Sequence, residues 1–261
     1  MKVTRLCFAA LASCLMFAGQ ASADIVIASY DAFPGLASSN GVPLSATISA
    51  NSVAAGFTSN ITNDTSDPLL RRSQTTAGSA NNTFGDGLTL DTTLSTAANS
   101  GRLQFLNGNT SAPTGVAGAE DANFFLNVTN GDAAQSLTFD ELLFDTVVQN
   151  SGAATGTHNA YSVIFENTTT SSVTGVLGSA TGLATGTNDA NIDLTGSGIS
   201  LAAGESGRFV FNFSGGGLGS SSSGSIDNIA ITGQFVEAVP EPSSLALLGL
   251  GAIGLVTRRR R

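Results

Sequence analysis

Few residues of this chain have the type and spacing that catalysis or metal binding requires. His158 is the only histidine of the 261 residues, and it stands in the polar stretch Gly156-Thr157-His158-Asn159. A zinc site or a Ser-His-Asp triad would have to use it, but no second histidine and no Gly-x-Ser-x-Gly motif accompanies it. We therefore interpret His158 as a solvated loop residue.

Adjacent carboxylates occur twice, at Glu120-Asp121 and at Asp140-Glu141. Glycoside hydrolysis needs two carboxyl groups on the two sides of one glycosidic bond. Neighbouring residues of a strand point to opposite faces of the sheet, so neither pair makes this arrangement by itself. We interpret both pairs as solvated edge or loop residues, and we keep a hydrolase with an unidentified site as a third functional hypothesis.

Between residues 24 and 239 the chain is strongly acidic. This part contains four arginines, no lysine and eighteen acidic residues, which gives a net charge of −14. A surface of that charge repels nucleic acid and anionic lipid, so we expect neither as a partner. Sparse charge of one sign among many Ser, Thr, Asn and Gly residues is typical of a solvated extracellular surface.

Residues 1–23 have the pattern of a secretory signal peptide. Lys2 and Arg5 precede a largely apolar stretch, and Ala21-Ser22-Ala23 supplies the small residues that signal peptidase requires. We expect export through the Sec translocon and cleavage before Asp24, so that the predicted signal helix is absent from the mature protein.

Both cysteines of the chain lie inside this signal peptide. The sequence Leu11-Ala12-Ser13-Cys14 resembles a bacterial lipobox, which would make Cys14 a lipidated first residue. The apolar stretch continues beyond Cys14, however, and we favour cleavage before Asp24. Cys7 and Cys14 then leave with the signal peptide, and the mature domain has neither a disulfide nor a cysteine nucleophile. Its stability must come from a hydrophobic core.

The body of the chain, residues 24–238, shows the period-two alternation of strands and no apolar pattern at helical spacing. A slip in the alternation predicts a bulge near Asp140, and Thr129-Asn130-Gly131-Asp132 predicts a turn. Residues 24–87 are interpreted as the first strands of the same domain, with long loops. The expected strands contain Leu88, Leu90 and Leu94; Leu103 and Phe105; Phe124, Leu126 and Val128; Leu137 and Phe139; Leu142 and Phe144; Tyr161, Val163 and Phe165; Phe209, Phe211 and Phe213; and residues 226–236.

Short, regularly spaced strands of this kind predict an all-β fold, namely an antiparallel two-sheet β-sandwich. The segments 160–163, 208–211 and 225–233 resemble the jelly-roll domains that occur in exported bacterial proteins, and those in turn resemble carbohydrate-binding jelly rolls. The resemblance implies a jelly-roll-like sandwich over about residues 120–235.

The C-terminal segment, residues 239–261, combines three features. Pro240-Glu241-Pro242 holds the backbone extended, because each proline fixes its own φ and restricts the residue before it. Residues 243–257 are uncharged and largely apolar. As a helix they would span about 22 Å, which is short of the roughly 30 Å of a bilayer core. The arginines that follow favour the cytoplasmic side, so we expect a short transmembrane helix with the body on the opposite face.

In this order the three features resemble the PEP-CTERM sorting signal of Gram-negative bacteria. The resemblance implies recognition by an exosortase, a membrane-embedded cysteine enzyme that cuts near the signal and passes the protein outward. Proteins of this kind occur in bacteria that make extracellular polysaccharide. An ordinary short C-terminal membrane anchor is the alternative. The residues assigned to sorting and processing are Pro240, Glu241, Pro242, Arg258, Arg259, Arg260 and Arg261.

A structural calcium ion at Asp227 is the one metal site that we expect. Ile226-Asp227-Asn228-Ile229 resembles the closing strand of several carbohydrate-binding jelly rolls, in which an aspartate at this place ligates calcium. Adjacent first and last strands would bring Asp24 or Asp31 close to it, and calcium takes six to eight oxygen ligands. The alternative is that Asp227 faces solvent or caps a turn.

Two functional hypotheses rank above the hydrolase. The first is a non-enzymatic protein of the cell surface or extracellular matrix, sorted and processed by an exosortase after transient anchoring in the inner membrane. The second is a carbohydrate-binding module for exopolysaccharide. Sugar rings usually stack on exposed aromatic side chains, and this chain has no Trp and only Tyr30 and Tyr161 beside its phenylalanines. A site that binds sugar by hydrogen bonds alone stays open.

Overall fold

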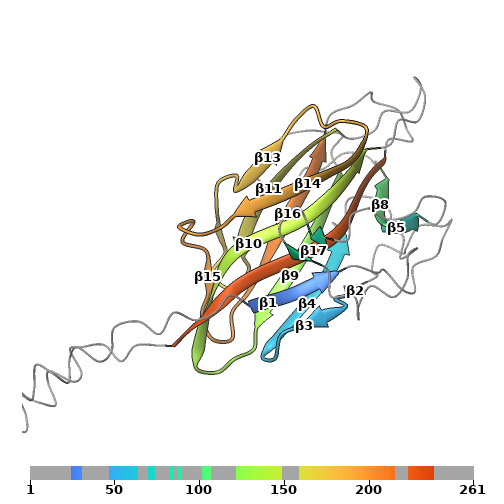
Figure 1. Cartoon of the computed structure of the whole chain (residues 1–261). Coiled ribbons are helices and arrows are strands. Elements are labelled where there is room, and N and C mark those ends of the chain that lie inside the picture. Colours follow the sequence, from blue (N-terminus) through green and yellow to red (C-terminus); the bar gives the residue numbers. More distant parts are fainter. Residues whose placement is uncertain are drawn as a thin grey trace, which may run out of the picture.

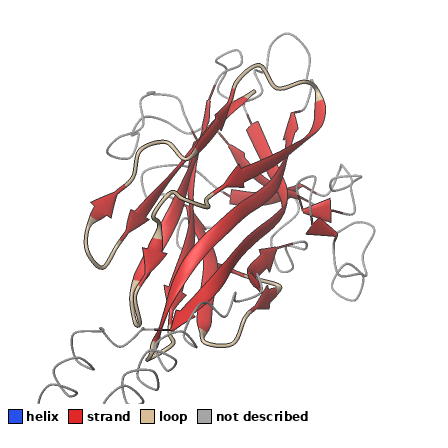
Figure 2. Ribbon diagram, turned by 60° about the vertical axis from the view of Figure 1, so that its left-hand side comes forward, coloured by secondary structure: helices blue, strands red, loops and turns tan. Residues whose placement is uncertain are grey.

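The structure is a computed structural model that describes residues 25–30, 47–63, 70–73, 83–84, 88–89, 102–106, 122–148, 159–214 and 223–237. Within these residues every regular element is a β-strand, as Figure 2 shows. The all-β prediction is therefore confirmed. The described part of the chain contains no helix with the length and apolar character to cross a membrane. The predicted signal helix and C-terminal helix lie outside the described residues.

Two antiparallel sheets make up the domain. Sheet A contains eight strands and follows the order β14-β10-β17-β1-β3, with β15 beside β10, β8 beside β17 and β5 beside β8. Its strands are β14 (Gly186–Asp193), β10 (Gln135–Val148), β17 (Ser223–Glu237), β1 (Ile25–Tyr30), β3 (Ser52–Val53), β15 (Ser200–Leu201), β8 (Arg102–Leu106) and β5 (Leu70–Ser73).

Sheet B contains seven strands in the order β12-β11-β16-β9-β4-β2, with β13 beside β11. Its strands are β12 (Ser172–Val173), β11 (Ala160–Asn167), β16 (Ser206–Ser214), β9 (Ala122–Asn130), β4 (Phe57–Asn63), β2 (Ile48–Ser49) and β13 (Gly178–Ala180). A separate pair, β6 (Thr83–Phe84) and β7 (Leu88–Thr89), lies against the rest through β6, which contacts β10 and β17. All of these pairings are antiparallel.

Aromatic side chains fill the space between the sheets. Phe211 of sheet B is fully buried, stacks on Phe124 at a centroid distance of 4.5 Å and meets Phe144 of sheet A edge to face at 5.2 Å. Phe139 of sheet A meets Phe209 of sheet B edge to face at 5.3 Å. Such contacts add to the free energy gained by burying the rings, and they hold the two sheets together as a sandwich.

The bulge and the turn expected from the sequence are both present. The register of β10 against β17 shifts between Phe139 and Glu141, and Leu142 follows Leu137 and Phe139 into the core. In the turn, Asp132 Oδ1 accepts the backbone N–H groups of Ala134 at 2.7 Å and Gln135 at 2.9 Å. These two hydrogen bonds lower the pKa of the Asp132 carboxyl.

The first and last strands lie side by side, as the jelly-roll resemblance implies. Ile25 pairs with Gly233 and Tyr30 with Ile229, and Figure 1 shows β1 running along β17. Because the two strands are antiparallel, the start of β1 and the end of β17 lie at the same end of the sandwich. The predicted signal peptide and sorting segment are therefore joined to the same end of the domain.

One buried hydrogen bond connects the two sheets directly. Tyr30 of β1 is fully buried, and its hydroxyl lies 2.8 Å from Ser59 Oγ on β4. Ser59 in turn donates to the carbonyl of Asn127 on β9 at 2.9 Å. Burial raises the pKa of Tyr30, and the hydrogen bond between its hydroxyl and Ser59 opposes this change only in part.

Candidate functional site

Polar side chains form a continuous row across the outer face of sheet B. Glu166, Arg208, Asn127 and Asn60 lie at successive cross-strand positions of β11, β16, β9 and β4. Their sequence neighbours Phe165, Phe209, Leu126 and Ile61 belong to the inter-sheet core. Since successive side chains of a strand alternate between faces, the four polar side chains point away from the core. We call these four residues the polar row.

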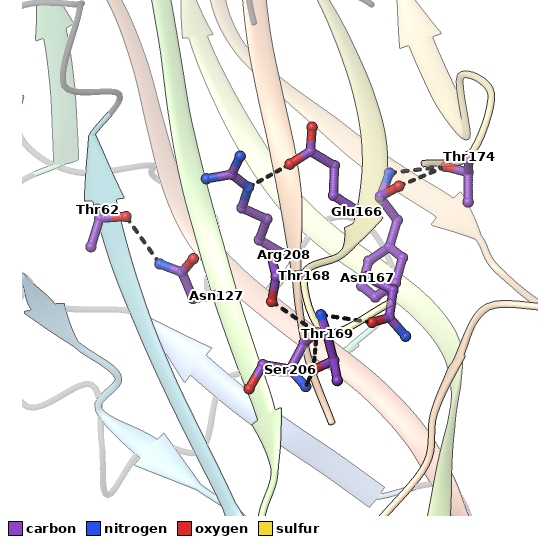
Figure 3. Close-up of polar contacts among 10 residues, drawn as sticks. Thr62, Asn127, Glu166, Asn167, Thr168, Thr169, Thr174, Ser206 and Arg208 are labelled. Atoms are coloured by element: carbon purple, nitrogen blue, oxygen red, sulfur yellow. Dashed lines mark hydrogen bonds and ion pairs between the residues drawn. The ribbon is translucent and has the colours of Figure 1, made fainter. Parts of the chain in front are cut away.

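Arg208 is held in place from two sides, as Figure 3 shows for its contact with Glu166. Its Nε donates to Glu166 Oε2 at 2.6 Å, and its Cζ lies 3.8 Å from the centroid of the Phe125 ring. The Arg208 side chain is 30% exposed and that of Glu166 is 12% exposed. An ion pair and a cation–π contact together restrict the guanidinium to one orientation while one of its edges stays open to solvent.

Asn127 is oriented by the strand on its other side. Its Nδ2 lies 3.0 Å from Asn60 Oδ1, 3.0 Å from Thr62 Oγ1 and 3.3 Å from the Asn60 carbonyl oxygen. The carbonyl oxygen can only accept, so the amide nitrogen must be the atom that faces β4. The Oδ1 atom of Asn127 consequently points away from β4 (Figure 3).

Apolar and hydroxyl groups flank the polar row. On one side Ile164, Val210 and Phe125 occupy the next outward positions and form a buried cluster of their own. On the other side Thr129 and Ser206 are joined by a hydrogen bond of 2.8 Å between their hydroxyl groups. The polar row thus lies between a buried apolar cluster and a pair of hydroxyl groups, and together with that pair it presents amide, hydroxyl and ionic groups, a combination that suits a ligand rich in hydroxyl groups.

Asp227, the residue predicted to bind calcium, lies on the outer face of sheet A and is only 1% exposed. It is directly opposite Asp145 of β10, which is fully buried. Asn228, at a φ of 45°, donates its Nδ2 to Asp145 Oδ2 at 2.8 Å and its backbone N–H to Asp227 Oδ1 at 3.1 Å. Asp227 therefore does not face solvent, which was one of the alternatives to calcium binding.

Two buried carboxylates side by side require positive charge or shared protons nearby. β8 pairs with β17 as far as Leu103, which lies opposite Ile226, the residue before Asp227. The described residues contain no group of three or more His, Cys, Asp or Glu side chains arranged to hold a metal ion. They supply two carboxylates of the six to eight oxygens that calcium takes, and calcium at Asp227 stays a prediction.

Most of the other residues singled out from the sequence lie outside the described part of the chain. These are His158, Glu120-Asp121, Asp31, the cleavage residues Ala21, Ala23 and Asp24, and the sorting residues Pro240, Glu241, Pro242, Arg258, Arg259, Arg260 and Arg261. Asp140 and Glu141 are described and lie at the bulge of β10, where Glu141 is exposed and pairs with Asp193 of β14.

The polar row itself was not predicted. Glu166 and Arg208 are 42 residues apart in sequence, and Asn127 is 81 residues from Arg208. A register between distant strands brings them together, and no local pattern encodes that register. The one sequence signal was Arg208 itself, a lone basic residue beside the alternating phenylalanines of a strand in an acidic domain.

Two solved structures are similar to the chain at low identity. An arabinose-bound GH51 α-L-arabinofuranosidase has a TM-score of 0.34 and 14% identity, and the match covers 80% of this chain and 27% of that chain. A carbohydrate-binding module, CBM28, specific for non-crystalline cellulose, has a TM-score of 0.30 and 12% identity over 54% of this chain and 79% of that chain. At these scores the two similarities indicate no function for this chain.

The C-terminal end gives a more specific match. No curated protein is detectably similar to the chain. Residues 238–261, however, match the PEP-CTERM protein-sorting motif, and they include the Pro-Glu-Pro sequence, the apolar segment and the terminal arginines. The chain therefore carries a PEP-CTERM sorting motif, which indicates a protein that is exported and processed by an exosortase.

Proposed function

We propose that this chain is a non-enzymatic protein of the cell surface or the extracellular matrix, delivered by its C-terminal sorting segment. The observation that carries the proposal is the PEP-CTERM motif at residues 238–261. It follows a sandwich with one continuous aromatic and aliphatic core shared by both sheets. A domain of this kind serves as a stable folded body that the sorting segment delivers.

The processing steps follow from the chemistry of the two ends. Signal peptidase cleaves after Ala23, and the apolar segment after Pro242 then enters the inner membrane for a time. The arginines at 258–261 stay on the cytoplasmic side, because translocating them across the bilayer is costly. The extended Pro240-Glu241-Pro242 segment gives the exosortase a backbone that it can engage, and cleavage near it frees the domain.

Replacement of Pro240, Glu241 and Pro242 by alanine tests this proposal. We expect the variant to stay in the membrane fraction with its full C-terminus, while the natural protein reaches the medium or the cell surface. The matched control replaces Ser243 and Ser244 by alanine, which leaves the Pro-Glu-Pro sequence unchanged. Normal release of the triple variant would contradict the sorting assignment.

Carbohydrate binding to exopolysaccharide is the second candidate, and the polar row favours it. Arg208, Glu166 and Asn127 offer hydrogen-bonding groups on a rigid sheet face, without the aromatic platform that stacking requires. A hydrolase is the third candidate, and the described carboxylates give it no specific support. The hydrolase hypothesis would be supported if the protein released reducing sugar from a polysaccharide and the double variant Asp140→Asn/Glu141→Gln did not.

A further inference from the structure

We infer that Glu166, Arg208 and Asn127 form a subsite that recognises two neighbouring hydroxyl groups of a neutral sugar. The inference deepens the carbohydrate-binding candidate and rests on it. It names the residues, the class of ligand and the part of the ligand that they bind. We call these three residues the hydroxyl subsite.

The subsite contains hydrogen-bonding atoms that the described protein does not use. Arg208 donates through Nε alone, which leaves the N–H groups of both η nitrogens. Glu166 accepts through Oε2, so that Oε1 stays available. Asn127 uses its Nδ2 toward β4 and leaves Oδ1 as an acceptor. Donors and acceptors therefore alternate along adjacent strands, in the order Asn127, Arg208 and Glu166.

Hydroxyl groups fit this alternation better than other ligand groups. Each hydroxyl both donates and accepts a hydrogen bond. One can donate to Asn127 Oδ1 and accept from Arg208, while its neighbour accepts from Arg208 and donates to Glu166 Oε1. A pair of hydroxyls on adjacent carbon atoms can share the guanidinium of Arg208, while the acceptors that they donate to lie on the two neighbouring strands, each about 4.8 Å away. A lone carboxylate or ammonium group would satisfy only half of these partners.

Charge selects neutral sugars over acidic ones. Glu166 already balances Arg208 across their 2.6 Å contact, so the subsite carries no net charge. The domain from residue 24 to residue 239 carries four basic and eighteen acidic residues, and its field repels polyanions. Uronic acids and sulfated sugars are therefore disfavoured, as are nucleic acids.

The subsite is preorganised for binding. Phe125 and Glu166 fix the guanidinium of Arg208, and Asn60 with Thr62 fixes the amide of Asn127. Ligand binding then orders few additional side chains, which reduces the entropic cost of association. Thr129 and Ser206 continue the polar surface along the strands, so a polymer can extend beyond a single sugar.

The test measures binding of the intact exported protein by affinity electrophoresis. The probes are dextran, galactomannan and xyloglucan, which are neutral and carry neighbouring hydroxyls, and alginate, which is acidic. We expect binding to at least one neutral polysaccharide and none to alginate. Periodate, which cleaves the carbon–carbon bond between neighbouring hydroxyls, should abolish binding to that polysaccharide. Binding that survives periodate treatment, or a preference for alginate, would overturn the inference.

Three variants assign the binding to the subsite. Arg208→Met and Asn127→Ala should each weaken it by about tenfold or more, because both remove hydrogen bonds to the ligand. Arg208→Lys keeps the charge but lacks the planar fork, and it should weaken binding even where Arg208→Met folds poorly. The matched control, Asn191→Ala on β14 of sheet A, should bind normally. If the natural protein binds a neutral polysaccharide and all three variants bind it equally well, the subsite is contradicted. Carbohydrate binding by another part of the protein would then still be supported. Absence of binding to every neutral probe would contradict both.

Discussion

Two acidic side chains are buried on the outer face of sheet A, whereas the charged side chains of the polar row are partly exposed on the outer face of sheet B. On sheet A, Asp145 and Asp227 are 0% and 1% exposed and take hydrogen bonds from Asn228. On sheet B, Arg208 and Glu166 keep 30% and 12% of their side-chain surface exposed, and several of their polar atoms remain available. Buried charge is costly and is retained only with compensating contacts, whereas an ion pair that is partly open to water adds less stability. We therefore expect changes to the carboxylates of sheet A to affect folding, and changes to the polar row of sheet B to affect the proposed ligand binding.

A substitution in the core between the two sheets should cause the largest loss of stability, and the losses expected on the two outer faces can be compared with it. Phe211 is fully buried between Phe124 and Phe144. Phe211→Ala should reduce the free energy of unfolding by about 3–5 kcal/mol, because it removes a ring that contacts side chains of both sheets and leaves a cavity. Denaturant unfolding gives the value. A loss below about 1 kcal/mol would place this strand outside the core.

The outer face of sheet A should show the next largest effect. Asp227→Ala should cost about 1–3 kcal/mol, because it leaves the buried N–H of Asn228 without its acceptor. The same variant tests calcium, since an ion that binds only the folded state raises its stability. We expect millimolar calcium to raise the midpoint of thermal unfolding of the natural protein and a chelator to lower it. The midpoint of Asp227→Ala should not respond. If a chelator leaves the midpoint of thermal unfolding of the natural protein unchanged, the calcium site is excluded.

Tyr30 gives a smaller effect that depends on pH. Burial raises the pKa of Tyr30, so the folded protein keeps the phenol neutral when the unfolded chain begins to ionise it at a pH of about 10. The stability that Tyr30 contributes is thus complete below pH 10 and falls as the pH rises above it, by about 1.4 kcal/mol per pH unit. Unfolding titrations between about pH 9 and 11 should show this slope, and Tyr30→Phe should reduce it. Burial also raises the pKa of Tyr161, so part of the slope stays in that variant. An equal slope in Tyr30→Phe would show that another group titrates.

The elements predicted correctly are those with a strong local pattern. Phe209, Phe211 and Phe213 alternate with polar or smaller residues, and the slip beside Asp140 identified its bulge without any tertiary information. β14 was missed, because Gly186–Asp193 contains only Ala190 and Ile192 as inward apolar residues. An edge strand needs only one apolar side, and its exposed side chains resemble those of a loop.

Asp145 shows why the sites were harder to predict than the strands. It lies in the apolar sequence Leu142-Leu143-Phe144-Asp145, and a polar residue in such a position is a signal of a buried contact. Its partner Asp227 is 82 residues away and became its neighbour only through the register of β10 and β17. Arg208 and Asn127 meet through the register of β16 and β9 in the same manner.

Arg208→Met should have the smallest effect on stability of the core, carboxylate and polar-row variants, about 1 kcal/mol, because it removes one partly exposed ion pair and one cation–π contact. Its effect should instead appear in ligand binding. This separation of stability from binding distinguishes the face of sheet B from that of sheet A.

The most direct test of this difference measures unfolding and polysaccharide binding on the same two variants, Arg208→Met and Asp227→Ala. We expect Arg208→Met to lose binding to a neutral polysaccharide by about tenfold or more while it unfolds almost as the natural protein does. Asp227→Ala should unfold more easily and bind as the natural protein does while folded. A result in which binding falls in both variants in proportion to lost stability, or in which Arg208→Met binds normally, would contradict the account.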